Sequence, residues 1–183
     1  MTQILPENPP MLLESQPRLD PPTDTLRGIP YGIGGVRATL AAMRQAAIQA
    51  SVTLEVRSLA ESIIENVPPK DFKGELEAIQ DWVRTNIRYT RDPLYAETLK
   101  LPHALLEARQ GDCDDQATLV AALALSIGFK PRFVAIGTEQ YGSFDHVYTE
   151  VKLGTQWVHV EKTEMVPVGW RPDGVKARFE FHI

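Results

Sequence analysis

The only cysteine of the chain, Cys113, lies in the stretch ARQGDCDDQATLVAALALSIGF (residues 108–129), just before a long apolar run. This pattern predicts a helix that begins near Asp112. At the first turn of a helix, unsatisfied backbone N–H groups and the positive end of the dipole stabilise an anion, which favours the thiolate form of a cysteine. The position of Cys113 therefore suits a nucleophilic thiol.

Three carboxylates next to Cys113 act against this effect, because nearby negative charge disfavours a thiolate. They belong to Asp112, Asp114 and Asp115. The helix dipole contributes only about 0.3–1 kcal/mol, so a reactive thiolate needs an imidazolium partner. The aspartates also have a structural explanation, with Asp112 as the N-cap and Asp115 as the acidic member of a capping box. For Cys113 the alternative is a small buried hydrophobic residue.

The spacing of two predicted strands selects one histidine as that partner. The segments HVYTEVKL (146–153) and QWVHVEKT (156–163) alternate in polarity and are separated by a Gly-Thr pair that is typical of a tight hairpin turn. With a two- or four-residue turn, Tyr148 lies opposite Glu161, and Glu161 is the diagonal neighbour of His146, at about 7–8 Å. A three-residue turn would place Glu161 on the other face. The prediction is thus a His146–Glu161 pair.

His159 is the rival of His146, because it shares a strand and a face with Glu161. It lies nearer the middle of the hairpin, whereas His146 follows the polar loop GTEQYGSFD at the start of a strand, where active-site residues collect. We therefore favour His146. Asp145 is interpreted as a surface charge, with a second orienting carboxylate as the alternative. The chain has four histidines: His103, His146, His159 and His182.

The elements around these residues predict an α+β fold. Apolar residues recur at helical spacing in four segments, and Gly128 is the expected C-terminal glycine of the cysteine helix. The predicted helices cover residues from about 35 to 47, 56 to 67, 74 to 89, 102 to 111 and 112 to 127, and the predicted strands are RFVAIG (132–137), the two hairpin strands and KARFEFHI (176–183).

Composition predicts one folded domain with an appendage. Residues 1–34 hold seven of the 14 prolines, so we expect an extended arm there, disordered or docked on a protein partner, and a single domain over residues 35–183. The net charge of −5 without a basic run gives no sign of nucleic-acid binding. No apolar run reaches the length of about 18 residues that a membrane span needs. A lone cysteine and an opening without a signal-peptide pattern predict a cytoplasmic, reducing location.

The motifs GDCDDQATLVAALALSIGFKPRFVAIG and DHVYTEVKLGTQWVHVEKT resemble the core of the transglutaminase-like superfamily of papain-fold cysteine enzymes. The similarity covers roughly residues 74 to 165. The family pattern is Gly-Asp-Cys on a helix, a histidine that starts a strand, and an aspartate at the end of the next strand. Cys113, His146 and Glu161 fall on these positions, with glutamate in place of the usual aspartate. The resemblance implies a papain-like core in which N-terminal helices and the cysteine helix pack on a small antiparallel sheet.

The resemblance also implies thiol acyl transfer on an amide. Cys113 would attack, His146 would carry the proton and Glu161 would fix the imidazole tautomer. The backbone N–H of Cys113 would form part of an oxyanion hole, and Tyr89, Gln110 and Trp82 are candidates for its second donor. Water as the acceptor would give a cysteine peptidase or amidase, which we favour for a peptide or protein substrate. An amine acceptor would give a crosslinking transglutaminase.

Three further interpretations concern a phage origin, a non-catalytic fold and a metal site. The front half of the chain is similar to small transglutaminase-like proteins of phages and prophages, which implies a virion-associated location if the chain is phage-encoded. A fold kept as a non-catalytic interaction or particle-assembly module is the main alternative. A metal site built from DCDD and His146 is disfavoured, because the calcium-loop glycine and glutamate and a second zinc-binding cysteine are absent. We expect no cofactor.

Overall fold

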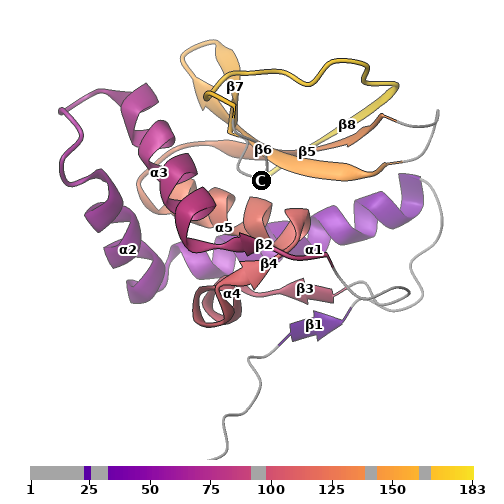
Figure 1. Cartoon of the computed structure of the whole chain (residues 1–183), viewed down its shortest axis with the longest axis horizontal. Helices are drawn as coiled ribbons and strands as arrows, with labels where there is room; N and C mark the ends of the chain where they lie inside the picture. The colour runs from indigo at the N-terminus through magenta and orange to yellow at the C-terminus, as the bar shows by residue number, and fades with distance from the viewer. Residues whose placement is uncertain (1–22, 26–32, 92–97, 139–143, 161–165) are drawn as a thin grey trace, which may run out of the picture.

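The computed structural model describes residues 23–25, 33–91, 98–138, 144–160 and 166–183. Within these ranges the chain forms a mixed helical and strand fold, as predicted (Figure 1). The helices are α1 (Ile33–Ser51), α2 (Leu54–Ile64), α3 (Phe72–Asn86), α4 (Pro102–Ala108) and α5 (Cys113–Ser126). The strands are β1 (Thr23–Thr25), β2 (Arg88–Tyr89), β3 (Thr98–Lys100), β4 (Gln110–Gly111), β5 (Pro131–Gly137), β6 (His146–Leu153), β7 (Gln156–Val160) and β8 (Ala177–His182).

The main sheet is antiparallel and has the strand order β7-β6-β5-β8. Its strands are those predicted from period-two alternation, including the C-terminal segment, which pairs with β5. The β6–β7 turn consists of two residues, because Leu153 pairs with Gln156, and Gly154 adopts a φ of 59° that favours glycine. Lys152 lies opposite Trp157, which confirms the predicted register.

Helix α5 forms the centre of the molecule. It packs against β5 and β6 on one side and is contacted by all four other described helices (Figure 1). Every residue from Asp115 to Ala124 is buried, so this part of the helix is enclosed on all sides. The helix is followed by Gly128 at a φ of 94°, in the predicted glycine position.

The two faces of the sheet differ in chemistry. The face toward α5 carries apolar residues such as Phe133 and Val147, and it is tied to the helix by Thr149, whose buried hydroxyl donates to the carbonyl of Ala117 at 2.9 Å. The outer face carries Tyr148 together with charged residues of β5, β6 and β8. Because neighbouring residues in a strand point to opposite faces, His146 shares the outer face with Tyr148.

The segment before the cysteine helix differs from the prediction. The helix expected to reach Tyr89 ends at Asn86, and Arg88 and Tyr89 form β2 parallel to β4. This pairing gives backbone partners that a helix end would lack, with the Arg88 N–H donating to the Arg109 carbonyl at 2.9 Å. Helical periodicity in residues 74–89 could not show where the helix ends and β2 begins, because a strand of two residues is too short to have a periodicity of its own.

Of the predicted arm, residues 23–25 are described and form β1, which pairs antiparallel with β3. The other residues before Ile33 lie outside the described ranges. None of the helices in the described part of the chain combines the length and the hydropathy that crossing a membrane requires.

Candidate active site

Cys113 is the first residue of α5, as predicted, and its side chain is half-buried against the core. The capping box is present. The Asp112 carboxylate accepts from the N–H groups of Asp114 (3.1 Å) and Asp115 (3.3 Å), and the Asp115 carboxylate accepts from the Asp112 N–H at 3.3 Å. The Cys113 thiol donates to the Asp114 carboxylate at 3.4 Å. The sequence motif therefore fixes where the helix begins and holds the sulfur at its N-terminus.

Asp115 is fully buried beneath the thiol segment and links it to β3. Its carboxylate accepts from the Lys100 backbone N–H at 2.7 Å and from the Lys100 ammonium at 2.9 Å. Burial raises the pKa of Asp115, and the hydrogen bonds from Lys100 act in the opposite direction. Asp115 thus serves the local structure more than the chemistry of the thiol.

The glycine of the Gly-Asp-Cys motif has a steric explanation. A Cβ atom on Gly111 would lie 2.5 Å from Asp115 Oδ2 and 2.7 Å from Leu105 Cδ1, closer than non-bonded atoms approach. Only glycine lets β4 pass this close to the buried carboxylate, which in turn caps α5.

We expect Gly111→Ala to lower the free energy of unfolding by about 1–3 kcal/mol, because overpacking displaces the Asp115 carboxylate from its donors. Urea denaturation measures the change. Gly34→Ala is the matched control, since a Cβ at Gly34 in α1 meets no atom within 4 Å. A Gly111→Ala protein as stable as the Gly34→Ala protein would contradict the steric account.

His146 is the first residue of β6, as predicted, and is half-buried. Its ring lies 6.1 Å from the Tyr148 ring, between centroids. The next residue, Val147, belongs to the core against which Cys113 packs. Thr149 and Ala117, which are hydrogen-bonded to each other, lie three residues after His146 and four residues after Cys113. Cys113 and His146 are therefore the first residues of α5 and β6, two elements that pack against each other.

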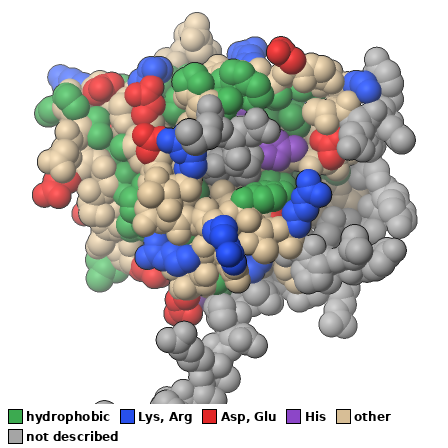
Figure 2. Space-filling view, in the orientation of Figure 1, with side chains coloured by type: hydrophobic (Ala, Val, Ile, Leu, Met, Phe, Trp, Pro, Cys, Tyr) green, Lys and Arg blue, Asp and Glu red, His purple; other side chains and the backbone are tan. Residues whose placement is uncertain are grey.

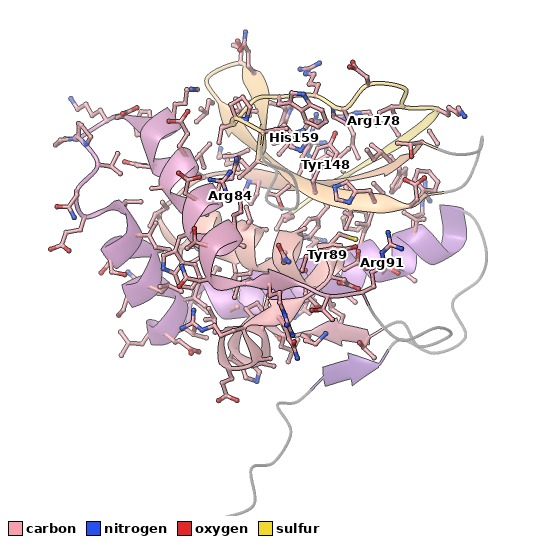
Figure 3. The ribbon with its side chains drawn as sticks, in the orientation of Figure 1. Arg84, Tyr89, Arg91, Tyr148, His159 and Arg178 are labelled. Atoms are coloured by element: carbon pink, nitrogen blue, oxygen red, sulfur yellow. The ribbon has the colours of Figure 1, made fainter. Side chains whose placement is uncertain are left out.

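His159 is buried, with 2% of its surface exposed. Its ring stacks on Tyr148 at 3.8 Å between centroids, and the Trp170 ring lies at 5.9 Å (Figure 3). This position between two aromatic rings separates His159 from solvent and favours His146 as the histidine that a substrate can reach. On the face shown in Figure 2, histidine is visible at the surface between hydrophobic side chains.

Glu161 lies outside the described residues, because the structure describes β7 only to Val160. The register on which its assignment depends is observed up to the Thr149–Val160 pair. The role of Glu161 as the orienting acid stays a prediction. Asp145 has a structural role, since its carboxylate accepts from the backbone N–H of Thr138 at 2.9 Å and from the Thr138 hydroxyl at 3.1 Å.

The three side-chain candidates for the oxyanion hole lie in different surroundings. Tyr89, on β2, is 44% exposed, and burial followed by the charge of Cys113 raises the pKa of its phenol. The Gln110 side chain accepts a hydrogen bond from Arg88, and Trp82 lies under the Arg109 guanidinium at 5.4 Å. These contacts account for Gln110 and Trp82 without catalysis. Tyr89 also has a structural partner, a side-chain hydrogen bond with Arg91, but it interacts electrostatically with the thiol as well.

A charged network on the outer face was not predicted. The Tyr148 hydroxyl accepts from Arg178 Nη1 at 2.6 Å, and Glu150 accepts from Arg178 at 2.9 Å and from Arg132 at 2.6 and 2.8 Å. Burial alone would raise the pKa of Glu150, but the hydrogen bonds from Arg178 and Arg132 hold it below its usual value. Alternation in β6 places Tyr148 and Glu150 on one face, but the pairing with β8 that brings Arg178 to them is non-local.

Comparisons with known proteins identify the family and the fold of the chain. The sequence model of the transglutaminase-like superfamily matches residues 57–162, which include Cys113, His146 and Glu161. No curated protein matches the chain. A solved structure named as a proposed cysteine protease from Cytophaga hutchinsonii is similar, with 21% sequence identity and a TM-score of 0.54, over 68% of this chain and 42% of that one.

A second solved structure, named as a proposed protease from Parabacteroides distasonis, shares 13% identity at a TM-score of 0.55, over 72% of this chain and 26% of that one. The chain thus spans less than half the length of either protein. These likenesses concern the fold. The superfamily match covers more than half of the 183 residues. The chain therefore belongs to the transglutaminase-like superfamily.

Proposed function

We propose that the protein is a thiol-dependent amidase that hydrolyses peptide or isopeptide bonds with a Cys113–His146–Glu161 triad. The observation that carries the proposal is the position of the thiol: Cys113 is half-buried at the capped N-terminus of α5, which packs against the strand that begins with His146. A helix N-terminus lowers the pKa of a thiol, and an imidazole that reaches the sulfur would take its proton.

The reaction would proceed in two steps. The Cys113 thiolate forms a C–S bond to the amide carbonyl carbon, and the C–N bond of the resulting tetrahedral oxyanion breaks as imidazolium His146 gives its proton to the leaving amine. Water then loses a proton to His146 and attacks the thioester. The C–S bond breaks, which releases a carboxylate and restores the thiolate. Glu161 would hold the imidazole in the required tautomer.

The Cys113 backbone N–H and the Tyr89 hydroxyl are the proposed donors to the oxyanion. The ordinary pKa of a tyrosine phenol lies well above neutral pH, and burial raises that of Tyr89 further, so the hydroxyl is protonated and able to donate a hydrogen bond. In the view of Figure 3, Tyr89 and Arg91 lie below the main sheet, over the helices, whereas Tyr148 and His159 lie above it.

Tyr89→Phe is expected to lower kcat by about 10²-fold with little change in KM, as loss of one oxyanion donor does. The alkylation rate of Cys113 by iodoacetamide should stay unchanged, because the hydroxyl acts on the oxyanion and not on the thiol. Steady-state kinetics and an alkylation time course measure both quantities. An unchanged kcat, or an equal loss in alkylation, would remove Tyr89 from the oxyanion hole.

The proposed function is tested with a mixed peptide pool in H₂¹⁸O, with and without a primary amine such as cadaverine. Mass spectrometry should detect new peptide carboxylates that carry ¹⁸O with the wild-type chain and none with Cys113→Ala. Amine conjugates in place of labelled carboxylates would favour the crosslinking alternative. Products that are the same for both proteins, or no products from either, would contradict the proposal and favour a non-catalytic module.

A phage origin, a particle-associated location and a protein partner for residues 1–34 stay predictions from the sequence.

A further inference from the structure

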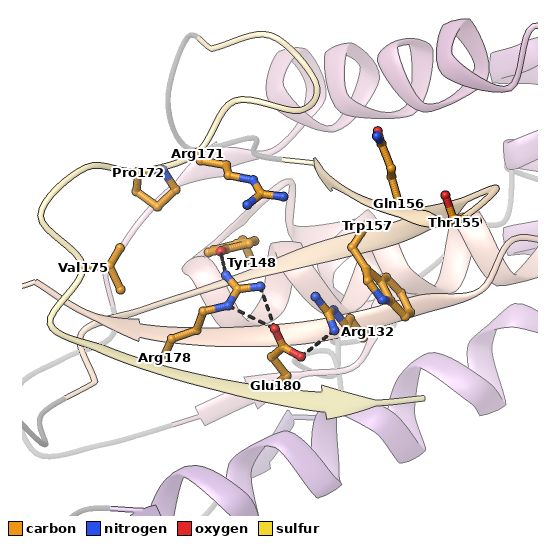
Figure 4. Close-up of a pocket in the computed structure, with 10 residues that line it drawn as sticks. All are labelled: Arg132, Tyr148, Thr155, Gln156, Trp157, Arg171, Pro172, Val175, Arg178 and Glu180. Atoms are coloured by element: carbon orange, nitrogen blue, oxygen red, sulfur yellow. Dashed lines mark hydrogen bonds and ion pairs between the residues drawn. The ribbon is translucent and has the colours of Figure 1, made fainter.

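A second candidate site lies on the outer face of the sheet, away from α5. It is a cavity of about 610 Å³ above β6 and β8, within the usual size range of ligand pockets (Figure 4). Its charged lining consists of Arg132, Arg171, Arg178 and Glu180, and Trp157, Pro172 and Val175 supply apolar walls. We propose that this cavity binds the carboxylate group of a peptide, with Arg171 as its main charged contact.

Two of the three arginines are already committed to acids of the sheet. Arg132 donates to Glu150 and Glu180, and Arg178 donates to the same two carboxylates and to the Tyr148 hydroxyl. Arg171 differs, because it forms neither an ion pair nor a hydrogen bond within the described part of the chain. Figure 4 shows its guanidinium reaching across the cavity toward Tyr148. Arg171 is therefore the donor that is available to a ligand.

The charges of the site match a singly charged anion. Arg132, Arg171 and Arg178 supply three positive charges, and Glu150 and Glu180 supply two negative ones, which leaves one positive charge. A carboxylate balances that charge. A phosphate group carries a charge of about −1.5 to −2 near neutral pH, which is more than the one positive charge of the site. The two glutamates would repel this excess negative charge. The planar guanidinium fork also fits the two oxygens of a carboxylate.

The apolar walls indicate what carries the carboxylate. Trp157 has the Arg132 guanidinium on one face, at 4.1 Å from its centroid, and it borders the cavity together with Pro172 and Val175. These groups suit the aliphatic and backbone carbon atoms of a short peptide segment. The carboxylate is then either the C-terminus of the peptide or an aspartate or glutamate side chain.

The cavity shares a face of the sheet with His146, because Tyr148 borders the cavity and lies two residues after His146 in β6. The inference concerns binding alone and does not require a reactive Cys113. It therefore goes beyond the proposed function and can fail or hold independently of it.

The test uses the full chain with Cys113→Ala, so that no peptide is consumed. Three probes are titrated: acetyl-Ala-Leu-Ala with a free carboxylate, the same peptide as its amide, and acetyl-Ala-Glu-Ala amide. NMR signals of the arginine Nε–H and tryptophan Nε1–H groups report binding. We expect at least one carboxylate peptide to shift the Arg171 and Trp157 signals, and the amide without a carboxylate to bind at least tenfold more weakly. The carboxylate peptide that binds more tightly shows whether the site prefers a C-terminal carboxylate or an acidic side chain.

Arg171→Met should weaken the bound peptide about tenfold, whereas Arg57→Met, which removes an exposed arginine of α2, should leave its affinity unchanged. Acetate should compete with the peptide at least as well as inorganic phosphate does. The proposal is overturned by any of three results: no binding by either carboxylate peptide, equal binding to the Arg171→Met protein, or stronger competition by phosphate. If any of these results is obtained while the chain that retains Cys113 still hydrolyses amides, only the carboxylate site is disproved and the proposed function is unaffected.

Discussion

Replacement of His146 by alanine is expected to lower kcat/KM for amide hydrolysis by about 10²–10⁴-fold, the range that a general acid–base group supplies. The variant loses both the proton acceptor for the thiol and the proton donor for the leaving amine. His146 is half-buried at the start of β6, so truncation opens little space in the core, and the fold should persist. Steady-state kinetics on a peptide that the wild-type chain cleaves, with a thermal melt of each protein, measures the effect.

His103→Ala is the matched control, because His103 is exposed on α4 and lies outside the proposed triad. Its kcat/KM should equal that of the wild-type chain. If His146→Ala retains full activity, or if both variants lose activity to the same extent, His146 is not the general acid–base group of this protein.

The largest expected effect on stability comes from Glu150→Gln, at about 3–5 kcal/mol. Glu150 is 3% exposed and accepts hydrogen bonds from both Arg132 and Arg178. The amide oxygen of a glutamine can still accept a hydrogen bond, but the buried Arg132 guanidinium then keeps only one carboxylate partner, Glu180, an acid at the edge of the network. Urea denaturation at pH 7 measures the difference. Glu180→Gln is the control, and its cost should be smaller because that side chain is 39% exposed.

The same variant has a defined pH dependence. The pKa of Glu150 is lowered on folding, so its contribution to stability is complete above the ordinary glutamate value of 4.5 and is lost as the pH falls through the lower folded-state pKa. The difference in unfolding free energy between wild type and Glu150→Gln should therefore be constant near neutral pH and shrink below pH 4.5. A difference that grows on acidification would contradict the assigned sign.

Local patterns in the sequence were sufficient to predict the elements that carry the candidate site. The capping residues Asp112 and Asp115 mark the start of α5, and the two-residue turn at Gly154 sets the register of the β6–β7 hairpin. Both features depend on residues close together in the chain, where spacing alone determines geometry. Cys113 and His146 consequently occupy the predicted ends of their elements.

Non-local features were beyond this reasoning. Strands β2 and β4 have two residues each, too few for a period, and they form because distant segments satisfy each other's backbone groups. The burial of His159 depends on Trp170, which comes from the segment before β8. The environment of Glu150 depends on Arg178, which the β5–β8 pairing brings to the outer face. Such contacts follow from the tertiary fold and leave no local pattern.

The proposed function depends on activation of the Cys113 thiol by His146. The most direct measurement is the rate of alkylation of Cys113 by iodoacetamide from pH 5 to 9, in the wild-type chain and in His146→Ala; the single cysteine makes the signal specific. We expect rapid alkylation below pH 7 in the wild-type chain, and a rate in His146→Ala that climbs about tenfold per pH unit until an ordinary thiol ionises near pH 8.5. Two superimposable profiles of the ordinary kind would contradict it.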